Sequence, residues 1–510
     1  MSKKLRLLPV LAVLALASRV DATNGPKLTA YGARAAGRGG VDYAYADDAI
    51  GPATNPAGMA FVYGNRLDQN WAFVDPRVTW SNSLGKTKDK DDIFAPVPAF
   101  SFGVTLDPTK SWEIGNLFDL GRWGLDDPPD ASETNLTEEE FELGSKVRIG
   151  FGIFPITGGK IQLKKMRTSV FTDPLDWEVD TLGLAITPSF AYRFTRWMSF
   201  GFNLQLQYTK FELDGGIAQP RSTLSDDFEF AAVLINNSPQ LFTKADLDDA
   251  FTYGGCWRAG LMFNFEKFSA GLVYQDRSYS ADYLGRANVN ATDEVNNLTQ
   301  GNPALLQVVD SRIDPARGFV SNYDLRIKHY EFPRMAGIGV AFRPNRRFSV
   351  GLDYTYIAYK ETFKTFRVRL SGGDNPNLDI MTSPTIPVRV PLNFRDQHVI
   401  ALGVTGLVAE GQDIVEGVPS WGLVLRAGYN YGRSPVPRRT TLPQLPVINE
   451  HHMSCGLSFL WGPLVELTAS FEYQLPKEYE VGFHLGDRSL SNSKQECEIL
   501  FFQIGVGARF

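Results

Sequence analysis

Stretches in which apolar and polar residues alternate recur along most of the chain after residue 69. Between 198 and 208, every second residue is apolar and the residues between them are Ser, Gly, Asn or Gln. The same period appears in 182–194, 348–356 and 423–431. Because successive side chains of a strand point to opposite faces, each stretch predicts a strand with one apolar and one polar face.

Strands of about ten residues with an apolar outer face and a polar inner face are typical of transmembrane β-barrels. After residue 22 no apolar run reaches about 18 residues, so the pattern predicts no helical membrane span. We therefore predict an all-β membrane protein, a 14-stranded antiparallel transmembrane β-barrel, with an even strand number as in bacterial barrels. The strands are expected near 69–80, 94–107, 144–155, 181–194, 198–212, 253–265, 268–283, 322–342, 346–360, 391–407, 421–432, 450–461, 464–479 and 497–510.

The predicted connections between strands alternate between tight turns and long polar loops, as in outer-membrane barrels and unlike β-sandwiches. The tight turns are 195–197, 266–267, 343–345 and 462–463, and the long loops are 213–252, 284–321, 361–390, 433–449 and 480–496. One long connection, 108–143, falls where a short turn is expected. Its acidic run and adjacent prolines are typical of a solvated insertion.

The first residues predict export across the inner membrane. Lys3, Lys4 and Arg6 precede an apolar run over 7–17, and small residues near Ala22 offer a cleavage site, so 1–22 is interpreted as a signal peptide. The three cysteines are too few for a disulfide framework and are interpreted as unpaired thiols. A net charge of -6 gives no indication of a nucleic-acid partner.

The stretch 31–60 breaks the alternation. It is rich in glycine and alanine and holds two prolines, a composition that suits short helices and turns packed closely against a surrounding wall. We predict a small, mostly helical N-terminal hatch at 23–65 that plugs the lumen of a barrel formed by 66–510. The run 37–40 is no phosphate-binding loop, because no strand-like stretch precedes it and no Gly-Lys-Ser/Thr follows.

The residues of this stretch also resemble a known family. The run 32–40 (GARAAGRGG), the run 46–49 (ADDA) and the tripeptide at 55–57 (NPA) are similar to the hatch of the FadL/TodX family of outer-membrane transporters. Further matches follow in order across most of the chain. They are Asp75-Pro76, Ala191-Tyr192-Arg193-Phe194, the run 272–278, Leu425-Arg426-Ala427-Gly428-Tyr429 and Ser434-Pro435-Val436-Pro437.

The resemblance implies passage of hydrophobic compounds such as long-chain fatty acids or aromatic hydrocarbons across the bacterial outer membrane. It implies capture of the ligand among the outer loops, movement of the hatch, and lateral exit through the wall. Asn55, Pro56 and Ala57 match the hatch motif, although an Asn-Pro turn is a plainer reading of them. The outer loops differ from the family pattern, so the identity of the substrate does not carry over.

Two further sets of residues are candidates for the transport path. Proline and glycine weaken a strand, so a bulge or break in the wall, and a lateral opening there, is predicted in one stretch. Its residues are Gly150, Gly152, Pro155, Gly158 and Gly159. Alternation places four arginines in the lumen, where one could bind a fatty carboxylate or all could form a structural network with acids such as Asp353. These are Arg148, Arg193, Arg258 and Arg426.

No catalytic or metal-binding motif accompanies these features. The chain has no Gly-x-Ser-x-Gly and no His-Glu-x-x-His, and the adjacent His451 and His452 point to opposite faces of a predicted strand, so we expect neither an enzyme, a metal site nor a cofactor. The chain ends in an alternating strand closing on Phe510, similar to strands read by the barrel-assembly machinery. A plugged hydrophilic porin or structural barrel, and an outer-membrane enzyme acting on lipids, remain the alternatives.

Overall fold

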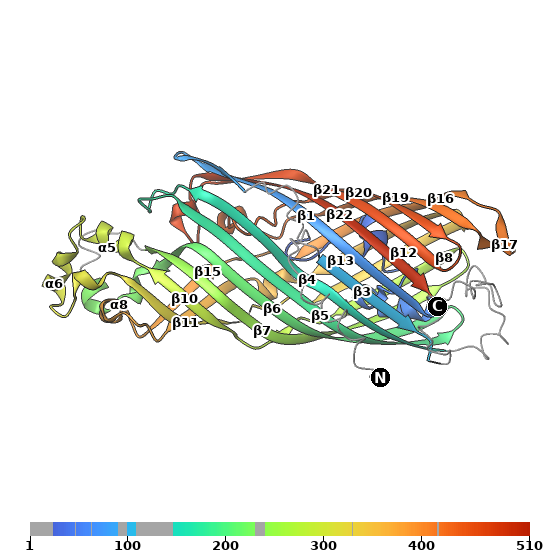
Figure 1. Cartoon of the computed structure of the whole chain (residues 1–510), viewed down its shortest axis with the longest axis horizontal. Coiled ribbons are helices and arrows are strands. Elements are labelled where there is room, and N and C mark those ends of the chain that lie inside the picture. The colour runs from blue at the N-terminus through green and yellow to red at the C-terminus, as the bar shows by residue number, and fades with distance from the viewer. Residues whose placement is uncertain are drawn as a thin grey trace, which may run out of the picture.

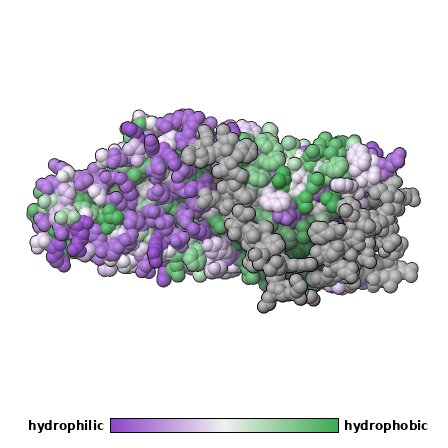
Figure 2. Space-filling view, viewed as in Figure 1, coloured by the Kyte–Doolittle hydropathy of each residue, from purple (hydrophilic) through white to green (hydrophobic). Residues whose placement is uncertain are grey.

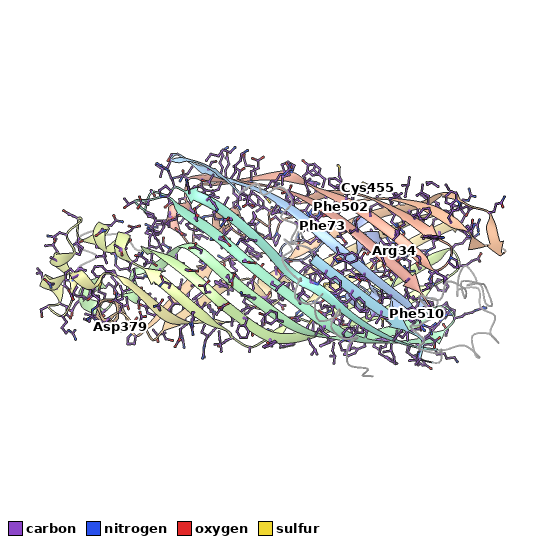
Figure 3. The ribbon with its side chains drawn as sticks, viewed as in Figure 1. Arg34, Phe73, Asp379, Cys455, Phe502 and Phe510 are labelled. Carbon is purple, nitrogen blue, oxygen red and sulfur yellow. The ribbon has the colours of Figure 1, made fainter. Side chains whose placement is uncertain are left out.

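The computed structural model describes residues 24–45, 47–62, 64–89, 99–108, 146–229, 240–328, 330–415 and 418–510. An antiparallel sheet of 14 wall strands closes into an elongated barrel, as predicted (Figure 1). The first and last wall strands, β1 (Arg66–Asn82) and β22 (Ser493–Arg509), pair with each other and complete the ring. Across this seam the rings of Phe73 and Phe502 lie 6.1 Å apart (Figure 3). The predicted signal peptide and most of the predicted 108–143 insertion lie outside the described residues.

Ten wall strands run without a break in the part of the chain that the structure describes. They are β1, β3 (Ala99–Leu106), β4 (Val147–Met166), β5 (Leu175–Thr195), β6 (Met198–Pro220), β7 (Gln240–Asn264), β19 (Trp421–Gly432), β20 (His451–Trp461), β21 (Val465–Val481) and β22. Two short hairpins accompany them, β2 (Gly85–Lys88) on β1 and the pair β17 (Asp413–Val415) and β18 (Val418–Pro419). The tight turns predicted at 195–197, 266–267 and 462–463 are confirmed, and the turn predicted at 343–345 lies at 346–347.

The other four wall strands are each divided by a break, which the sequence analysis missed. Continuous strands were predicted at 268–283, 322–342 and 391–407, and these three predictions were wrong, whereas the strand predicted at 346–360 is present as Phe348–Ile357. Prolines explain part of the pattern, since Pro333 lies in one break and Pro391 beside another, and proline cannot donate to a ladder. The divided strands are β8 (Phe268–Gln275) with β9 (Tyr279–Ser280) and β10 (Tyr283–Asn290), β11 (Val320–Lys328) with β12 (Met335–Asn345), β13 (Phe348–Ile357) with β14 (Thr365–Ser371), and β15 (Thr385–Pro391) with β16 (Gln397–Glu410).

The alternation changes phase at these breaks. On β12, Ile338 and Phe342 are exposed and Gly337 and Gly339 face the lumen. On β11, beyond the break, Tyr323, Leu325 and Ile327 are buried inside. The same inversion separates β13 from β14 and β16 from β15. An apolar exterior suits lipid and a polar exterior suits water, so the breaks mark where the outside of the wall leaves the membrane.

Beyond the breaks the wall continues as a long hydrophilic extension. Figure 2 shows a hydrophobic surface over the right-hand half of the wall and a hydrophilic one over the left-hand half, where α5 (Thr292–Leu298), α6 (Leu306–Val309) and α8 (Pro376–Met381) lie in Figure 1. Parts of the predicted loops 213–252, 284–321 and 361–390 are therefore strand. Lipid-facing strands carry apolar residues outward, whereas here the apolar residues face inward, around a core shared by β5, β6, β7, β10, β11, β14 and β15.

The described chain before β1, residues 24–62, lies inside the barrel, and we call it the lumenal segment. It contains α2 (Ala33–Gly37) and two short 3-10 helices, η2 (Gly51–Ala53) and η3 (Pro56–Phe61), joined by turns. It lies in the half with the hydrophobic exterior (Figure 1), where Arg34 of α2 is labelled in Figure 3. Among the described residues no helix is long and apolar enough to cross a membrane.

Candidate functional site

The lumenal segment is almost completely buried, and its predicted motif lies at the centre of its contacts. Asn55 is 1% exposed and caps η3, accepting a hydrogen bond of 3.1 Å from the backbone N–H of Ala57. Its amide nitrogen donates to the carbonyl oxygen of Tyr43 at 2.8 Å and to that of Leu261 on β7 at 3.3 Å. One side chain therefore joins two turns of the lumenal segment to each other and to the wall.

Pro56 and Ala57 rest directly on β6. The hydroxyl of Ser199 donates to the carbonyl oxygen of Ala57 at 2.8 Å, and a Cβ at Gly201 would overlap the backbone of both residues. Pro56 also fixes the first helical position after the cap, where its missing N–H costs nothing. The motif is thus a packed element of the barrel interior.

Inward-facing glycines on successive strands leave the space that the lumenal segment occupies. At each of them an added Cβ would press against this segment, so the bare backbone forms a ring on which it lies. Gly201 stands opposite Gly260, Gly351 opposite Gly403, and Gly403 opposite Gly428 in the register. The ring consists of Gly103, Gly150, Gly201, Gly260, Gly271, Gly337, Gly339, Gly351, Gly403, Gly428 and Gly456. The alternation over 198–208 places a glycine on the inward face, but the ring itself was not predicted; its signal is glycine at an inward position on strand after strand.

Buried ion pairs hold the other side of the lumenal segment. Arg38 bridges Asp42 at 2.7 Å and Asp47 at 2.6 Å, and Arg34 pairs with Glu466 of β21. Burial raises the pKa of Asp42, and the Arg38 charge only partly opposes this effect. Charges buried in pairs are costly to separate, so these contacts favour the seated position of the segment.

Asp353 of β13 is the wall acid named in the sequence analysis, and it too binds the lumenal segment. One of its carboxylate oxygens accepts hydrogen bonds from the backbone N–H groups of Asp42 and Tyr43, at 2.7 and 3.0 Å. The contact orders the turn that also receives the Asn55 amide. The turn is therefore held by Asp353 of β13 and by Asn55, which also donates to β7.

The four candidate arginines are buried, as the alternation predicts, and each has protein partners. Arg148 pairs with Asp107 at 3.0 Å, and Arg193 donates to the carbonyl oxygen of Arg196 and lies over the ring of Phe61. Arg258 donates to the carbonyl oxygen of Ala53 in the lumenal segment. These contacts favour a structural role, and carboxylate binding by any of the four stays a prediction.

Arg426 completes this set. Its guanidinium donates to the hydroxyl of Ser458 and lies 3.5 Å from Glu466, the acid that also pairs with Arg34. It therefore belongs to the network that seats the lumenal segment.

Lys27, which was not predicted from the sequence, is a cation that lines a small cavity beside the lumenal segment. It lines a cavity of about 30 Å³ together with Gln205, Gln207 and Gln275, and its amine contacts the sulfur of Met335. In the described chain no carboxylate lies within ion-pair distance of it. Burial, helped by the charge of Arg258, lowers the pKa of Lys27 to about 7. No sequence pattern marks this residue, because its neighbours come from distant strands.

Above the lumenal segment, rings from the strand breaks fill the lumen. The ring of Tyr330 lies 5.4 Å from that of Phe363 and 5.6 Å from that of Phe366, and Tyr359 donates to the backbone carbonyl of Asn24. We call this set the aromatic cluster. It consists of Phe211, Tyr283, Tyr330, Phe332, Tyr359, Phe363, Phe366 and Phe394.

A second apolar surface runs beside the aromatic cluster along β1, β4, β5 and β22. It connects Leu28, Tyr31 and Ile50 of the lumenal segment with residues of the extension such as Trp177 and Phe242. Apolar side chains therefore form a contiguous interior surface from the extension to the lumenal segment.

The glycine-rich stretch of β4 has one irregularity. Pairing with β5 shifts between Pro155 and Thr157, so Ile156 is an extra residue, a β-bulge, and it lines the same cavity as Lys27. Gly150 and Gly152 lie in regular ladders with both β3 and β5, while Gly158 and Gly159 pair with β5 after the bulge. Between Phe154 and Gln162 no described strand pairs with the other side of β4. A lateral opening here stays a prediction.

An internal plug seated on the wall, a contiguous apolar surface in the interior and a lipid-facing exterior together define a plugged transmembrane β-barrel. The family model for outer membrane protein transport proteins (OMPP1/FadL/TodX) matches residues 146–494. The chain belongs to this family of outer-membrane transporters for hydrophobic compounds, and its place is the bacterial outer membrane, as predicted. Membership in a transporter family also confirms that the chain is not an enzyme.

Several known proteins are similar to this chain. Outer membrane protein P1 of Haemophilus influenzae is 21% identical over 345 residues, which span 61% of this chain and 66%, just under two thirds, of that protein. The toluene transporter TodX of Pseudomonas putida superposes with a TM-score of 0.67 at 16% identity, covering 95% of this chain and 99% of TodX. A FadL homologue of Pseudomonas aeruginosa gives a TM-score of 0.62 at 13% identity, covering 95% and 100%. At these identities the structural matches establish the fold.

Proposed function

We propose that this protein carries small hydrophobic molecules, aromatic hydrocarbons or long-chain fatty acids, from the outer surface through its lumen and sideways into the membrane. The observation that carries the proposal is the apolar lining that reaches from the extension to Leu28, Tyr31 and Ile50 of the lumenal segment. An apolar solute gains from leaving water for such a lining, whereas a polar solute loses its hydration there. A hydrophilic porin would need the opposite lining.

In this mechanism the lumenal segment acts as the hatch. Its cavities are small, about 30 and 40 Å³, so a ligand passes only if the residues around Lys27 and Tyr31 move. Asn55, Pro56 and Ala57 connect that movement to the wall. No energy source is needed, since ligand binding to the moved state shifts the population.

Aromatic compounds are the substrate class that we favour. Several rings of the aromatic cluster stand edge to face, and a flat ligand can replace one ring of such a pair without loss of contact geometry. Related proteins of this fold include the toluene transporters TodX and TbuX and the monoaromatic hydrocarbon channel CymD. If the ligand is a fatty acid, Lys27 would form an ion pair with its carboxylate.

Uptake by whole cells tests the substrate class. Cells that express the protein and cells that lack it receive radiolabelled toluene or a radiolabelled long-chain fatty acid, and accumulation is followed over the first minute. The proposal predicts faster accumulation of toluene with the protein. Equal accumulation of both compounds in the two strains would contradict it.

The lateral route is tested at the bulge of β4. Deleting Ile156 restores regular pairing between β4 and β5 and closes the irregular stretch. We expect a folded barrel with uptake of the hydrophobic substrate reduced by at least tenfold. Unchanged uptake would mean that ligand leaves by another path.

A further inference from the structure

Five cations gather on the outside of three neighbouring strands of the extension. In the register Lys328 of β11 stands opposite Arg367 of β14, and Arg367 stands opposite Arg389 of β15. Arg326 of β11 stands opposite Arg369 of β14, and this pair lies two residues further from the membrane along each strand. All point away from the buried core of the extension, and we call this surface the basic face.

The cations of the basic face are nearly free of acidic partners. Among the described residues Lys328, Arg367, Arg369 and Arg389 have no carboxylate within 4 Å, and only Arg326 has one, Asp282 at 3.8 Å. Like charges directly opposite each other destabilise a sheet. Three such pairs on one surface, with Asp282 as the single acid within 4 Å of them among the described residues, indicate an anionic partner.

The height of the basic face above the membrane identifies that partner. Arg326 and Lys328 occupy the end of β11 next to the break, whereas Asp324 and Asn322 face outward further from it. Arg367 and Arg389 likewise lie near the breaks of their strands. Positive charge is therefore concentrated at the level where the wall leaves the membrane.

Aromatic residues mark the membrane boundary just below the basic face. Tyr354 and Tyr356 stand at the outer end of β13, and the Tyr354 hydroxyl lies 2.7 Å from Nδ1 of His398 on β16. Girdles of this kind sit among lipid head groups. The basic face begins one strand break beyond the girdle, where phosphate groups of outer-leaflet lipids would lie.

We propose that the basic face binds the phosphorylated head groups of lipids in the outer leaflet. Arginine suits this role, because its planar guanidinium donates two parallel hydrogen bonds to a phosphate. Bound lipid would neutralise the opposed arginines and hold the extension upright on the membrane. The inference is independent of the transported substrate.

Lipid titration of the purified full-length protein tests this proposal. In a neutral detergent the protein receives diphosphoryl lipid A, dephosphorylated lipid A or phosphatidylcholine, and bound lipid is counted by native mass spectrometry. The test variant combines Arg367→Gln, Arg369→Gln and Arg389→Gln. The control variant combines Arg77→Gln, Lys210→Gln and Lys494→Gln, which removes the same charge from cations already paired with acids.

We expect the wild type and the control to bind diphosphoryl lipid A preferentially, and the test variant to bind it about a hundredfold more weakly, at roughly fivefold for each charge removed. Resistance of the folded barrel to unfolding on gels confirms that all variants fold. Equal binding by the test and control variants would overturn the proposal. So would equal binding of phosphorylated and dephosphorylated lipid, full competition by inorganic phosphate alone, or tighter binding of polyglutamate, which would indicate an acidic protein partner.

Discussion

The side-chain amide of Asn55 donates a hydrogen bond of 2.8 Å to the backbone carbonyl of Tyr43, and the backbone N–H of Tyr43 is held by Asp353 of the wall. Asn55 and Tyr43 are twelve residues apart, and their contact closes the lumenal segment into one unit seated on β7 and β13. Movement of the hatch away from the wall would break these hydrogen bonds.

Asn55→Ala should loosen the hatch without unfolding the barrel. The change removes an η3 cap and leaves the Tyr43 carbonyl without its donor, at a cost of about 1–3 kcal/mol. Faster hydrolysis of nitrocefin by a periplasmic β-lactamase would report the leak. Asn288→Ala, on the exposed surface of the extension, is the matched control and should leave the rate unchanged.

Gly201→Val should displace the hatch from its seat. The new side chain would occupy the space of the Pro56 and Ala57 backbone, so the segment must shift or leave the lumen. We expect frequent ion-conducting openings in planar bilayers, where the wild type stays closed. Gly482→Val adds the same side chain where no atom lies within 4 Å, and openings in that variant as well would refute a specific effect.

Phe363→Leu should alter substrate preference. Leucine keeps the site apolar but removes a ring that lies 5.4 Å from Tyr330 and 5.2 Å from Phe394. Toluene uptake should fall by about tenfold, since ring pairs contribute about 0.5–1.5 kcal/mol each. Fatty-acid uptake should change less, and an equal loss of both would point to a general packing defect.

Lys27→Met tests the cation in the lumen. Methionine keeps an unbranched side chain of similar length and removes the amine that would pair with a carboxylate. Uptake of a long-chain fatty acid should fall several-fold while toluene uptake is retained. Loss of both activities would assign Lys27 a role in seating the hatch.

The outer end of the barrel should weaken in acid. His484 is buried between two outer segments, accepting from the backbone N–H of Asp487 at Nδ1 and donating to the carbonyl oxygen of Thr441 from Nε2. Burial lowers its pKa from 6.5 to about 4. The neutral form is therefore required in the folded state, and stability is lost as pH falls from about 6.5 toward 4, by up to about 3 kcal/mol.

Thermal unfolding at pH 7.5 and pH 4.5 measures this effect. Acid should lower the unfolding temperature of the wild type relative to that of His484→Gln, which keeps a donor and an acceptor without titrating. Identical pH dependence in the two proteins would rule out His484 as the cause.

The sequence predicted the barrel because the membrane imposes a strict alternation. Strands such as β6 and β19 carry one apolar residue outward at every second position, and this signal needs no tertiary information. The same logic failed in the extension, where β11 and β14 turn their apolar residues inward and were taken for loop or continuous strand. Strands of the extension have an apolar interior and a polar exterior, as in a soluble protein. A pattern of outward-facing apolar residues therefore does not identify them.

The site was predictable only where one local motif carries it. Asn55, Pro56 and Ala57 are consecutive in the chain and form a helix cap and turn, so the local sequence alone indicates them. Lys27 meets wall residues more than a hundred positions away, and the aromatic cluster joins residues between 211 and 394, so nothing local indicates their proximity. The glycine ring was predictable in part. Alternation indicates that each glycine faces inward, but it does not indicate which residue of the lumenal segment each one contacts.

The central claim, a plugged barrel that passes hydrophobic rather than polar solutes, is tested most directly by measuring both fluxes in the same cells. Accumulation of labelled toluene and hydrolysis of nitrocefin by a periplasmic β-lactamase are compared with and without the wild-type protein. The account predicts that expression raises toluene accumulation and leaves nitrocefin hydrolysis unchanged. Faster nitrocefin hydrolysis with unchanged toluene accumulation would contradict it and make the protein a polar pore.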